Sequence, residues 1–243
     1  MITQQSTIYK APTLYKMGGA QKIVIPDNLK FYLYLENISG RFCFSVSTSS
    51  WSKRLDFSYT YKVVIETPTF SGDQTLSIFK LNPDGTTNNG NINSKIRCAV
   101  PYGRYEIQST NFQIPFGQTI SASKIINSSD YSLYSNKLIE VIVGPDTTYF
   151  DNMQINWNYP NSINTTIKGA NLILGTTYTW QTNYRIYGLV ISKGDKEYCR
   201  FLPAFNTENN KYCFYDIYNG RFMYPDTDGQ QIQAGPENPF IIP

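Results

Sequence analysis

The segment from Tyr184 to Ile191 constrains the fold most strongly, because its apolar residues occupy both faces of an extended strand. A strand places alternate residues on opposite faces, and one that is apolar on both is typical of the centre of a covered sheet. Strict alternation predicts two sets of neighbours: Ile186, Gly188 and Val190 on one face, and Tyr187, Leu189 and Ile191 on the other.

Two turn signals follow this strand. The loop Ser192–Lys196 contains Gly194, a residue that adopts positive φ without cost, so we expect a hairpin between 184–191 and 197–202. Asn219-Gly220 is the strongest two-residue hairpin signal and predicts pairing of 212–218 with 221–224. Two linked hairpins need a second sheet to cover them. The sequence therefore predicts an all-β protein, an antiparallel two-sheet sandwich.

The same region carries an ordered set of motifs. They are the corner Phe201-Leu202-Pro203, the pair Tyr215-Asp216, the turn at Gly220 and the close Ala234-Gly235-Pro236; Tyr187 and Phe222 complete the set. This order resembles a C-terminal signature of concanavalin A-like β-sandwich domains in phage structural proteins, of the head fibre or tail fibre type. Ala204 stands where that family often has Cys. The likeness spans 184–238, is fainter over 138–183 and is absent before that, and it implies a jelly-roll fold rather than an activity.

Alternation of apolar and polar residues predicts further short strands along the chain. We expect one large sandwich over 23–243 rather than separate domains. The Ser-rich loop 48–52 carries a Trp that we expect to be exposed, and residues 121–126 suggest one helical turn. The expected strands are 22–25, 30–35, 42–46, 55–65, 76–81, 96–100, 105–109, 112–114, 138–143, 148–157 and 171–175.

Residues 1–22 differ from the sandwich and predict an extended arm. A short pattern repeats after six residues, interrupted by Pro12 and followed by Gly18-Gly19. Aromatic and basic side chains at regular spacing suit binding along a partner's surface by strand addition, although a disordered or self-packed terminus is the alternative. The arm resembles the N-terminal tethers of phage fibre and decoration proteins. The residues expected to anchor it are Ile8, Tyr9, Lys10, Leu14, Tyr15 and Lys16.

Charge and residue types exclude several classes of function. The formal net charge is +3 and only 16% of residues are charged, so no basic stripe points to nucleic acid. The chain has no His, which excludes catalytic triads and metal sites built on imidazole. No apolar run reaches the ~20 residues that span a bilayer, and no signal peptide is recognisable. The 20 Tyr and 14 Phe residues favour permanent contacts or contacts with sugars over electrostatic steering.

The remaining candidates for chemistry are sparse. The four Cys residues, at 43, 98, 199 and 213, lack metal-binding spacing and are expected to be buried free thiols. The polar run 82–91 is expected to be a hairpin tip; calcium binding is the alternative, but the run lacks a ladder of acidic ligands. Glu140, Asp146 and Asp151 are the nearby carboxylates that a glycosidase would need, yet turns and strand faces explain them better. Asp216 is expected to cap a turn. We expect no cofactor and no metal.

Sugar binding requires an aromatic ring flanked by amide or hydroxyl groups. Two clusters meet this requirement, although filling of the core or of a subunit interface is the alternative role of their Trp residues. The candidate glycan-binding residues are Trp157, Asn158 and Tyr159 in the first cluster, and Tyr178, Trp180 and Asn183 in the second.

The resemblance implies a non-enzymatic protein on the surface of a phage virion, a head fibre or capsid decoration assembled in the host cytoplasm. The expected partners are further copies in a symmetric homo-oligomer, capsid or tail proteins through the arm, and surface glycans. A tail fibre or receptor-binding subunit is the alternative, and a polysaccharide-cleaving enzyme is a third possibility of a different class. We expect neither nucleic acid nor membrane as a partner.

Overall fold

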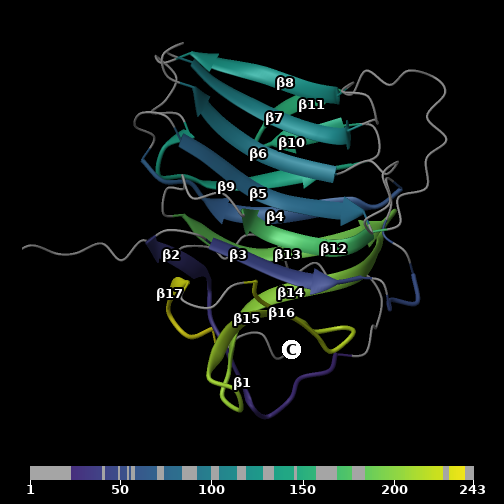
Figure 1. Cartoon of the computed structure of the whole chain (residues 1–243), viewed down its shortest axis with the longest axis vertical. Helices are drawn as coiled ribbons and strands as arrows, with labels where there is room; N and C mark the ends of the chain where they lie inside the picture. The colour runs from purple at the N-terminus through teal and green to yellow at the C-terminus, as the bar shows by residue number, and fades with distance from the viewer. Residues whose placement is uncertain are drawn as a thin grey trace, which may run out of the picture.

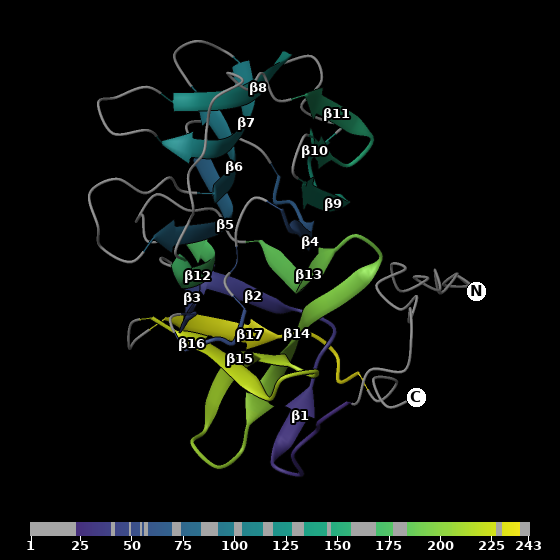
Figure 2. The same ribbon diagram turned by 90° about the vertical axis from the view of Figure 1, so that its right-hand side faces the viewer.

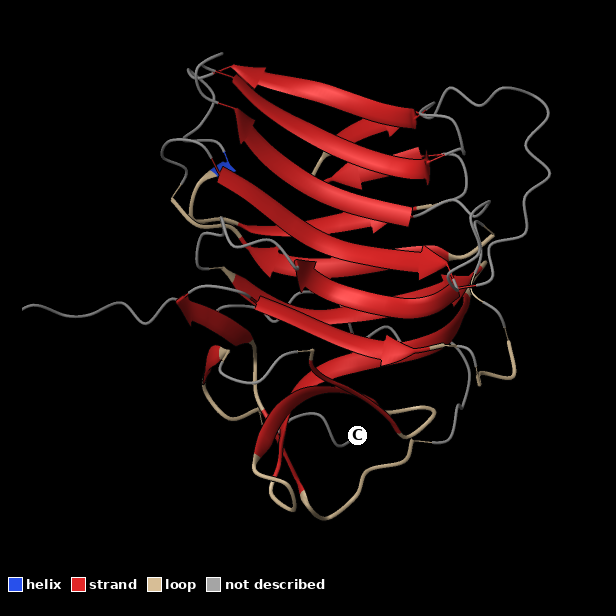
Figure 3. Ribbon diagram, viewed as in Figure 1, coloured by secondary structure: helices blue, strands red, loops and turns tan. Residues whose placement is uncertain are grey.

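A computed structural model of the chain describes residues 23–39, 42–48, 50–53, 55, 58–69, 74–83, 92–99, 104–113, 119–127, 134–144, 147–156, 169–176, 184–226 and 230–238. Strands dominate these residues (Figure 3). Every pairing between the described strands is antiparallel. The expected all-β class is confirmed.

The strands form two layers (Figures 1 and 2). The first layer follows the order β11-β10-β9-β4-β13-β14-β15-β16, with β2 and β17 beside the start of β13 and β1 beside the end of β14. Its strands are β1 (Leu29–Phe31), β2 (Leu35–Ser39), β4 (Thr60–Glu66), β9 (Leu138–Val143), β10 (Thr147–Phe150), β11 (Met153–Asn156), β13 (Arg185–Lys193), β14 (Lys196–Asn206), β15 (Lys211–Asp216), β16 (Arg221–Pro225) and β17 (Gln231–Ala234).

The second layer follows the order β8-β7-β6-β5-β12-β3. Its strands are β3 (Phe42–Ser47), β5 (Gln74–Pro83), β6 (Ile92–Ala99), β7 (Arg104–Gln113), β8 (Thr119–Asn127) and β12 (Gly169–Thr176). Strand β16 joins the layers, because Met223 pairs with Phe214 of β15 and Tyr224 pairs with Ser45 of β3. The result is the predicted two-sheet sandwich, which β16 closes along one edge.

The main core lies between the layers and follows from alternation along the strands. In β4 the residues Tyr61, Val63 and Ile65 are buried, while Lys62 and Glu66 are partly exposed on the outer face. Strand β9 repeats the pattern. Aromatic pairs such as Phe44 and Phe214, with centroids 4.9 Å apart, connect the two layers.

Strand β13 is central, as predicted, since it pairs with β4 on one side and with β14 and β2 on the other. The predicted division of its faces is wrong in one respect. The register shifts between Ile186 and Gly188, so Ile186 points into the main core together with Leu189 and Ile191. Tyr187 and Val190 instead share the outer face. A β-bulge adds one residue to a strand and changes its alternation, and strict periodicity does not anticipate it.

Hairpins form at both predicted turns, but the second has other limits than expected. Strand β15 ends at Asp216, which pairs with Arg221, so the turn spans residues 217–220 rather than Asn219-Gly220 alone. Gly194 has a φ of +57° in the turn between β13 and β14, and Gly220 has a φ of +67° in the turn between β15 and β16. These are values that glycine adopts without the steric penalty of a Cβ atom.

A second, smaller core covers the outer face of β14, β15 and β16. Buried Leu202, Ala204 and Tyr215 pack there against Leu29 and Phe31 of β1. The strand expected over 22–25 is wrong, because residues 23–26 lie outside any strand. This segment is nevertheless fixed, since the Val24 N–H donates to the Ile217 carbonyl at 2.8 Å and the Tyr215 hydroxyl donates to the Val24 carbonyl at 2.8 Å.

Several other predicted elements need correction. Residues 121–126 belong to β8 rather than to a helical turn, because they pair with β7 along their whole length. The strand expected over 148–157 is a hairpin of β10 and β11, turned at Asp151, whose φ is +54°. The strand expected over 55–65 begins at Thr60, and the one over 30–35 divides into β1 and β2. The motifs at 105–109 and 112–114 form a single strand, β7.

Trp51 was expected to be exposed and is instead 9% exposed, stacked on Phe201 at 6.3 Å. Its serine-rich neighbours indicated a loop correctly, but a large indole is buried wherever the core admits it.

Among the described cysteines, Cys43, Cys199 and Cys213 are buried free thiols, as predicted. Burial raises the pKa of the Cys213 thiol to about 12, which makes it unreactive.

Candidate functional site

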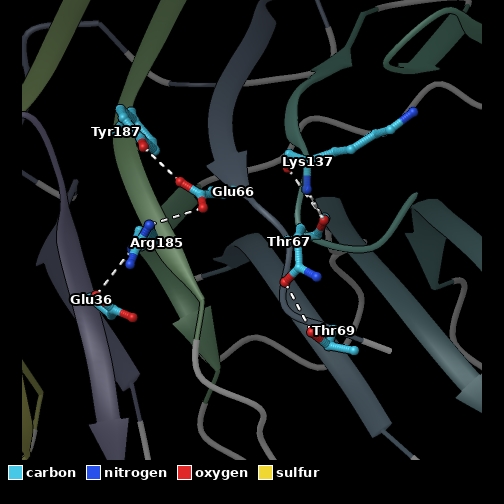
Figure 4. A network of polar contacts seen from close by, with 8 residues as sticks. Glu36, Glu66, Thr67, Thr69, Lys137, Arg185 and Tyr187 are labelled. Atoms are coloured by element: carbon cyan, nitrogen blue, oxygen red, sulfur yellow. Dashed lines mark hydrogen bonds and ion pairs between the residues drawn. The ribbon is translucent and has the colours of Figure 1, made fainter. Parts of the chain in front are cut away.

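Three charged residues face one another across neighbouring strands of the first layer. Arg185 of β13 lies opposite Glu36 of β2 on one side and opposite Glu66 of β4 on the other. The next residues along these strands, Leu35, Ile65 and Ile186, point into the core. The charged side chains therefore lie on the outer face of the sheet (Figure 4).

Arg185 binds both carboxylates. Its Nε donates to Glu36 Oε2 at 3.0 Å and its Nη1 donates to Glu66 Oε1 at 2.9 Å. The side chains of Arg185, Glu36 and Glu66 are 35%, 20% and 28% exposed, so a ligand can reach them. Partial burial lowers the pKa of the guanidinium, but its hydrogen bonds to the two carboxylates outweigh this and raise the pKa overall. The arginine is a permanent cation between two acceptors.

Two tyrosines complete the surface. The Tyr187 hydroxyl donates to Glu66 Oε2 at 2.8 Å, and its pKa is raised, first by burial and then by this hydrogen bond. The Arg185 guanidinium lies 4.7 Å from the centre of the Tyr34 ring, and the Tyr34 and Tyr187 rings are 5.3 Å apart. We call these five residues, Tyr34, Glu36, Glu66, Arg185 and Tyr187, the Arg185 patch.

The C-terminal region supports the patch from one side. Strand β17 pairs with β2, and the Gly235 N–H donates to the Tyr34 carbonyl at 3.0 Å. A Cβ atom on Gly235 would lie 2.6 Å from Tyr34 Cε1. A larger residue at 235 would therefore displace the Tyr34 ring.

The other side of the patch is held by the end of β4 (Figure 4). Thr67 follows Glu66 and exchanges hydrogen bonds with Lys137: the Lys137 N–H donates to Thr67 Oγ1 at 3.0 Å, and the Thr67 N–H donates to the Lys137 carbonyl at 2.8 Å. Thr69 Oγ1 donates to Asn136 Oδ1 at 3.0 Å in the same turn. Glu66 consequently projects from a backbone that is fixed on both sides.

The patch offers donors and acceptors side by side. A guanidinium has five N–H donors, and each carboxylate oxygen has more than one lone pair, so the patch can both donate to and accept from a ligand. Its three charged groups carry a net charge of −1. Among the described residues, no group of three or more Cys, Asp or Glu side chains is placed to hold a metal ion. The chemistry available is recognition of a polar, hydroxyl-rich molecule.

The glycan-binding candidates Trp157, Asn158, Tyr159, Tyr178, Trp180 and Asn183 lie outside the described residues, as do the arm residues Ile8, Tyr9, Lys10, Leu14, Tyr15 and Lys16. The loop 84–91 and Asp146 also lie outside them. Glu140 forms an ion pair with Lys62 at 2.7 Å, and Asp151 forms a turn, so both have the structural roles expected of them.

Asp216 caps the turn between β15 and β16, as predicted. Its Oδ1 accepts from the N–H groups of Arg200 and Tyr218 at 3.1 and 3.2 Å, and its Oδ2 accepts from Asn219 Nδ2 at 2.7 Å. Burial raises the pKa of this carboxyl, although these hydrogen bonds oppose the shift. Asp216 is fully buried and serves the fold.

The sequence did not reveal the Arg185 patch, apart from Tyr187 in the family motif. Arg185 lies more than a hundred residues after Glu36 and Glu66 in the sequence, and only the register of β13 with β2 and β4 brings the three together. The available signal was a charged residue beside the apolar run of each strand, at Glu36, Glu66 and Arg185. That pattern is common at strand ends and does not identify which strands are neighbours.

No protein-family model matches this chain, and no curated protein matches it either. Among solved structures it is similar to the enzymatically active domain of tailspike protein 2 of bacteriophage CBA120, with 11% identity, a TM-score of 0.44, and 74% of this chain and 30% of that chain covered. It is also similar to a family 16 endo-glucanase of Bacteroides ovatus, with 11% identity, a TM-score of 0.46, and 71% and 85% covered. A third is the carbohydrate-binding module CBM40 of a Ruminococcus gnavus sialidase bound to α2,6-sialyllactose, with 15% identity, a TM-score of 0.40, and 65% and 90% covered.

The chain spans less than a third of the length of the tailspike proteins to which it is similar. At these identities, function has to be argued from the residues of this chain.

Proposed function

We propose that this chain is a non-enzymatic glycan-binding protein of a bacteriophage particle, a head fibre or capsid decoration, and that the Arg185 patch holds the sugar. The observation that carries the proposal is the arrangement of Arg185 between Glu36 and Glu66, beside Tyr187, on the outer face of a rigid sheet. The phage assignment is supported by the family signature over 184–238.

Sugars fit this arrangement because each hydroxyl group both donates and accepts a hydrogen bond. Neighbouring hydroxyls can accept from the remaining N–H groups of Arg185 while donating to the oxygens of Glu36 or Glu66. The ring of Tyr187 beside them offers an apolar surface for the C–H face of a pyranose. Because the network exists before the ligand arrives, binding does not have to order these side chains.

The same contacts favour holding over cleaving. A glycosidase needs a carboxylic acid that protonates the glycosidic oxygen and a second carboxylate across the bond. Both oxygens of Glu66 already accept hydrogen bonds, from Arg185 and from Tyr187. Glu66 would have to break one of them to act as the acid, and Arg185 lies between it and Glu36.

A single shallow patch binds weakly, so the proposal includes many copies on one particle. Linked sites bind a multivalent surface far more tightly than one site binds one sugar. The arm expected over 1–22 would provide the attachment to capsid or tail proteins, and a homo-oligomer would multiply the sites. Electron microscopy of intact particles labelled for this chain tests the location.

A glycan array with two matched variants tests the function. Arg185→Ala removes the donor that joins the patch, so we expect binding to weaken by about tenfold, because one lost charged hydrogen bond costs about 1.5 kcal/mol. Lys62→Ala removes a cation from the same face of β4, where it pairs with Glu140, and should change binding less than about threefold.

Three results would contradict the proposal. Equal loss of glycan binding in Arg185→Ala and Lys62→Ala would mean a non-specific charge effect. Loss only in Trp157→Ala or Trp180→Ala would move the site to the clusters identified in the sequence. Release of shorter sugars from any bound polysaccharide would make the protein an enzyme.

A further inference from the structure

A second group of aromatic residues lies at the far end of β13 from Arg185. Trp51, Tyr59 and Tyr198 come together where the segment before β4 meets the start of β14. The Trp51 and Tyr198 ring centres are 6.3 Å apart, and those of Tyr59 and Tyr198 are 5.9 Å apart. Eight residues of extended strand separate Arg185 from Lys193, a distance of roughly 26 Å at about 3.3 Å per residue, so this is a different surface from the Arg185 patch.

Three cations lie over these rings. The Arg221 guanidinium is 3.9 Å from the centre of the Trp51 ring, Lys53 Nζ is 5.4 Å from that of Tyr198, and Lys193 Nζ is 5.2 Å from that of Tyr59. Cation–π contacts restrain the two lysines, which are otherwise exposed. Ordered lysines lose less conformational entropy on binding a ligand than freely moving ones.

Two of the nearby carboxylates are already engaged. Asp216 is buried and lies 3.8 Å from Arg221. Glu197 accepts from Arg200 Nε and from the Tyr218 hydroxyl, each at 2.9 Å. Among the described residues, none places a carboxylate within ion-pair distance of Lys53 or Lys193.

The turn adds to the excess of positive charge. Lys196 is paired directly opposite Lys193 across the β13–β14 hairpin, with Asp195 in the turn between them. Like charges placed directly opposite each other in a hairpin are unfavourable unless an anion compensates them.

The polar atoms of this surface are mainly donors. The ammonium groups of Lys53 and Lys193 only donate. The Tyr198 hydroxyl accepts from Arg221 Nη2 at 3.4 Å, which leaves its own hydrogen to donate. A surface whose donors outnumber its free acceptors matches a ligand that mainly accepts, such as an anion.

We infer that Lys53, Lys193 and the Tyr198 hydroxyl form a binding site for the carboxylate or sulfate groups of an acidic polysaccharide. Nucleic acid fits less well. Single strands bind by stacking their bases on exposed rings, and Trp51 and Tyr59 are only 9% and 6% exposed. A duplex requires a longer row of cations along its phosphates.

Calorimetry with oligosaccharides of matched length tests the site. The probes are a heparin-derived sulfated oligosaccharide, an alginate-derived carboxylated one and a neutral dextran-derived one. We expect the acidic probes to bind more tightly than the neutral one, and their affinity to fall as salt rises from about 50 to 200 mM. A preference between sulfate and carboxylate would identify which acidic group the site takes.

Three variants locate the binding. The double variant Lys53→Gln/Lys193→Gln should weaken binding of the acidic probes by about tenfold, and Tyr198→Phe by about threefold. Lys30→Gln removes one positive charge from an exposed lysine on β1, against two in the double variant, and should have less than a twofold effect. All these side chains are at least partly exposed, and unchanged thermal melting would confirm that the variants fold.

The inference is independent of the proposed function, because Arg185→Ala should leave binding of the acidic probes unchanged. It is overturned if the double variant and Lys30→Gln have equal effects, or if none of the acidic probes binds. It is also overturned if single-stranded DNA binds as tightly as the acidic sugars and depends on the same lysines, since the site would then be one for nucleic acid.

Discussion

Gly235 and Tyr34 illustrate how single residues determine the Arg185 patch. The Tyr34 ring contacts Arg185, Tyr187 and the backbone of Gly235. The ring therefore transmits the position of the C-terminal segment to the guanidinium. Gly235 belongs to the Ala-Gly-Pro motif that resembles a known family, and the structure gives it a physical purpose: space for an aromatic ring.

Gly235→Ala should displace Tyr34 and, with it, Arg185. A Cβ atom 2.6 Å from the ring forces a shift that we expect to cost about 1–3 kcal/mol of unfolding free energy, together with a loss of glycan binding. Urea unfolding and the glycan array measure the two effects. Gly194→Ala is the control, since its Cβ would meet no atom within 4 Å and only its φ of +57° is strained. Gly194→Ala should cost about 1 kcal/mol of unfolding free energy and leave glycan binding intact. A similar loss of glycan binding in Gly194→Ala and Gly235→Ala would argue against the link through Tyr34.

At the scale of elements, the segment 23–31 covers the outer face of β14 to β16. Leu29 and Phe31 pack on Leu202 and Tyr215, whereas the main core lies on the opposite face of those strands. The same sheet is therefore covered by β3 and its neighbours on one side and by the start of the chain on the other.

Truncation distinguishes this covering segment from the arm before it. Deletion of 1–22 should leave the melting temperature nearly unchanged and abolish attachment to particles. Deletion of 1–31 exposes apolar side chains and should cost on the order of 3–5 kcal/mol, with aggregation. Calorimetry and light scattering compare the two. Equal stability of both truncated chains would mean that the small core contributes nothing.

The elements that the sequence predicted well are those set by local rules. Strand β9 matches its expected limits, 138–143, because an apolar run interrupted only by Glu140 ends at Gly144-Pro145. The hairpins at Gly194 and Gly220 follow from turn chemistry in the same way. The failures depend on tertiary context: the bulge at Tyr187 changes the faces of β13, and pairing with β7 makes a strand of 121–126. The Arg185 patch could not be predicted, since its geometry is a matter of register between distant strands.

At the scale of the whole molecule, tyrosine is used as a structural residue as well as at the surface. Burial is the first cause that raises the pKa of Tyr32, Tyr184, Tyr187, Tyr215 and Tyr218, most strongly at Tyr184, which is 2% exposed. The folded protein therefore holds these rings neutral above pH 10, their ordinary pKa, where the unfolded chain would lose the protons.

The raised pKa values of these tyrosines predict that the protein loses stability at alkaline pH. A pKa that is higher in the folded state gives stability that is complete below pH 10 and is lost as pH rises through the folded value, at up to about 1.4 kcal/mol per pH unit for each tyrosine. Thermal melting between pH 8 and 12 should show a steep fall above pH 10, and Tyr184→Phe should fall less steeply. Titration of all the tyrosines near pH 10 with no loss of structure would contradict the raised pKa values of the buried tyrosines.

The proposed role of the outer face at Arg185 is to hold a sugar without cleaving it. Two-dimensional NMR of the isotope-labelled protein, titrated with the best oligosaccharide from the array, tests both halves in one sample. We predict shifts that concentrate on the amides of Glu36, Glu66, Arg185 and Tyr187, while the anomeric signals of the sugar stay constant for days. Shifts confined to other residues, or new reducing-end signals from the sugar, would contradict it.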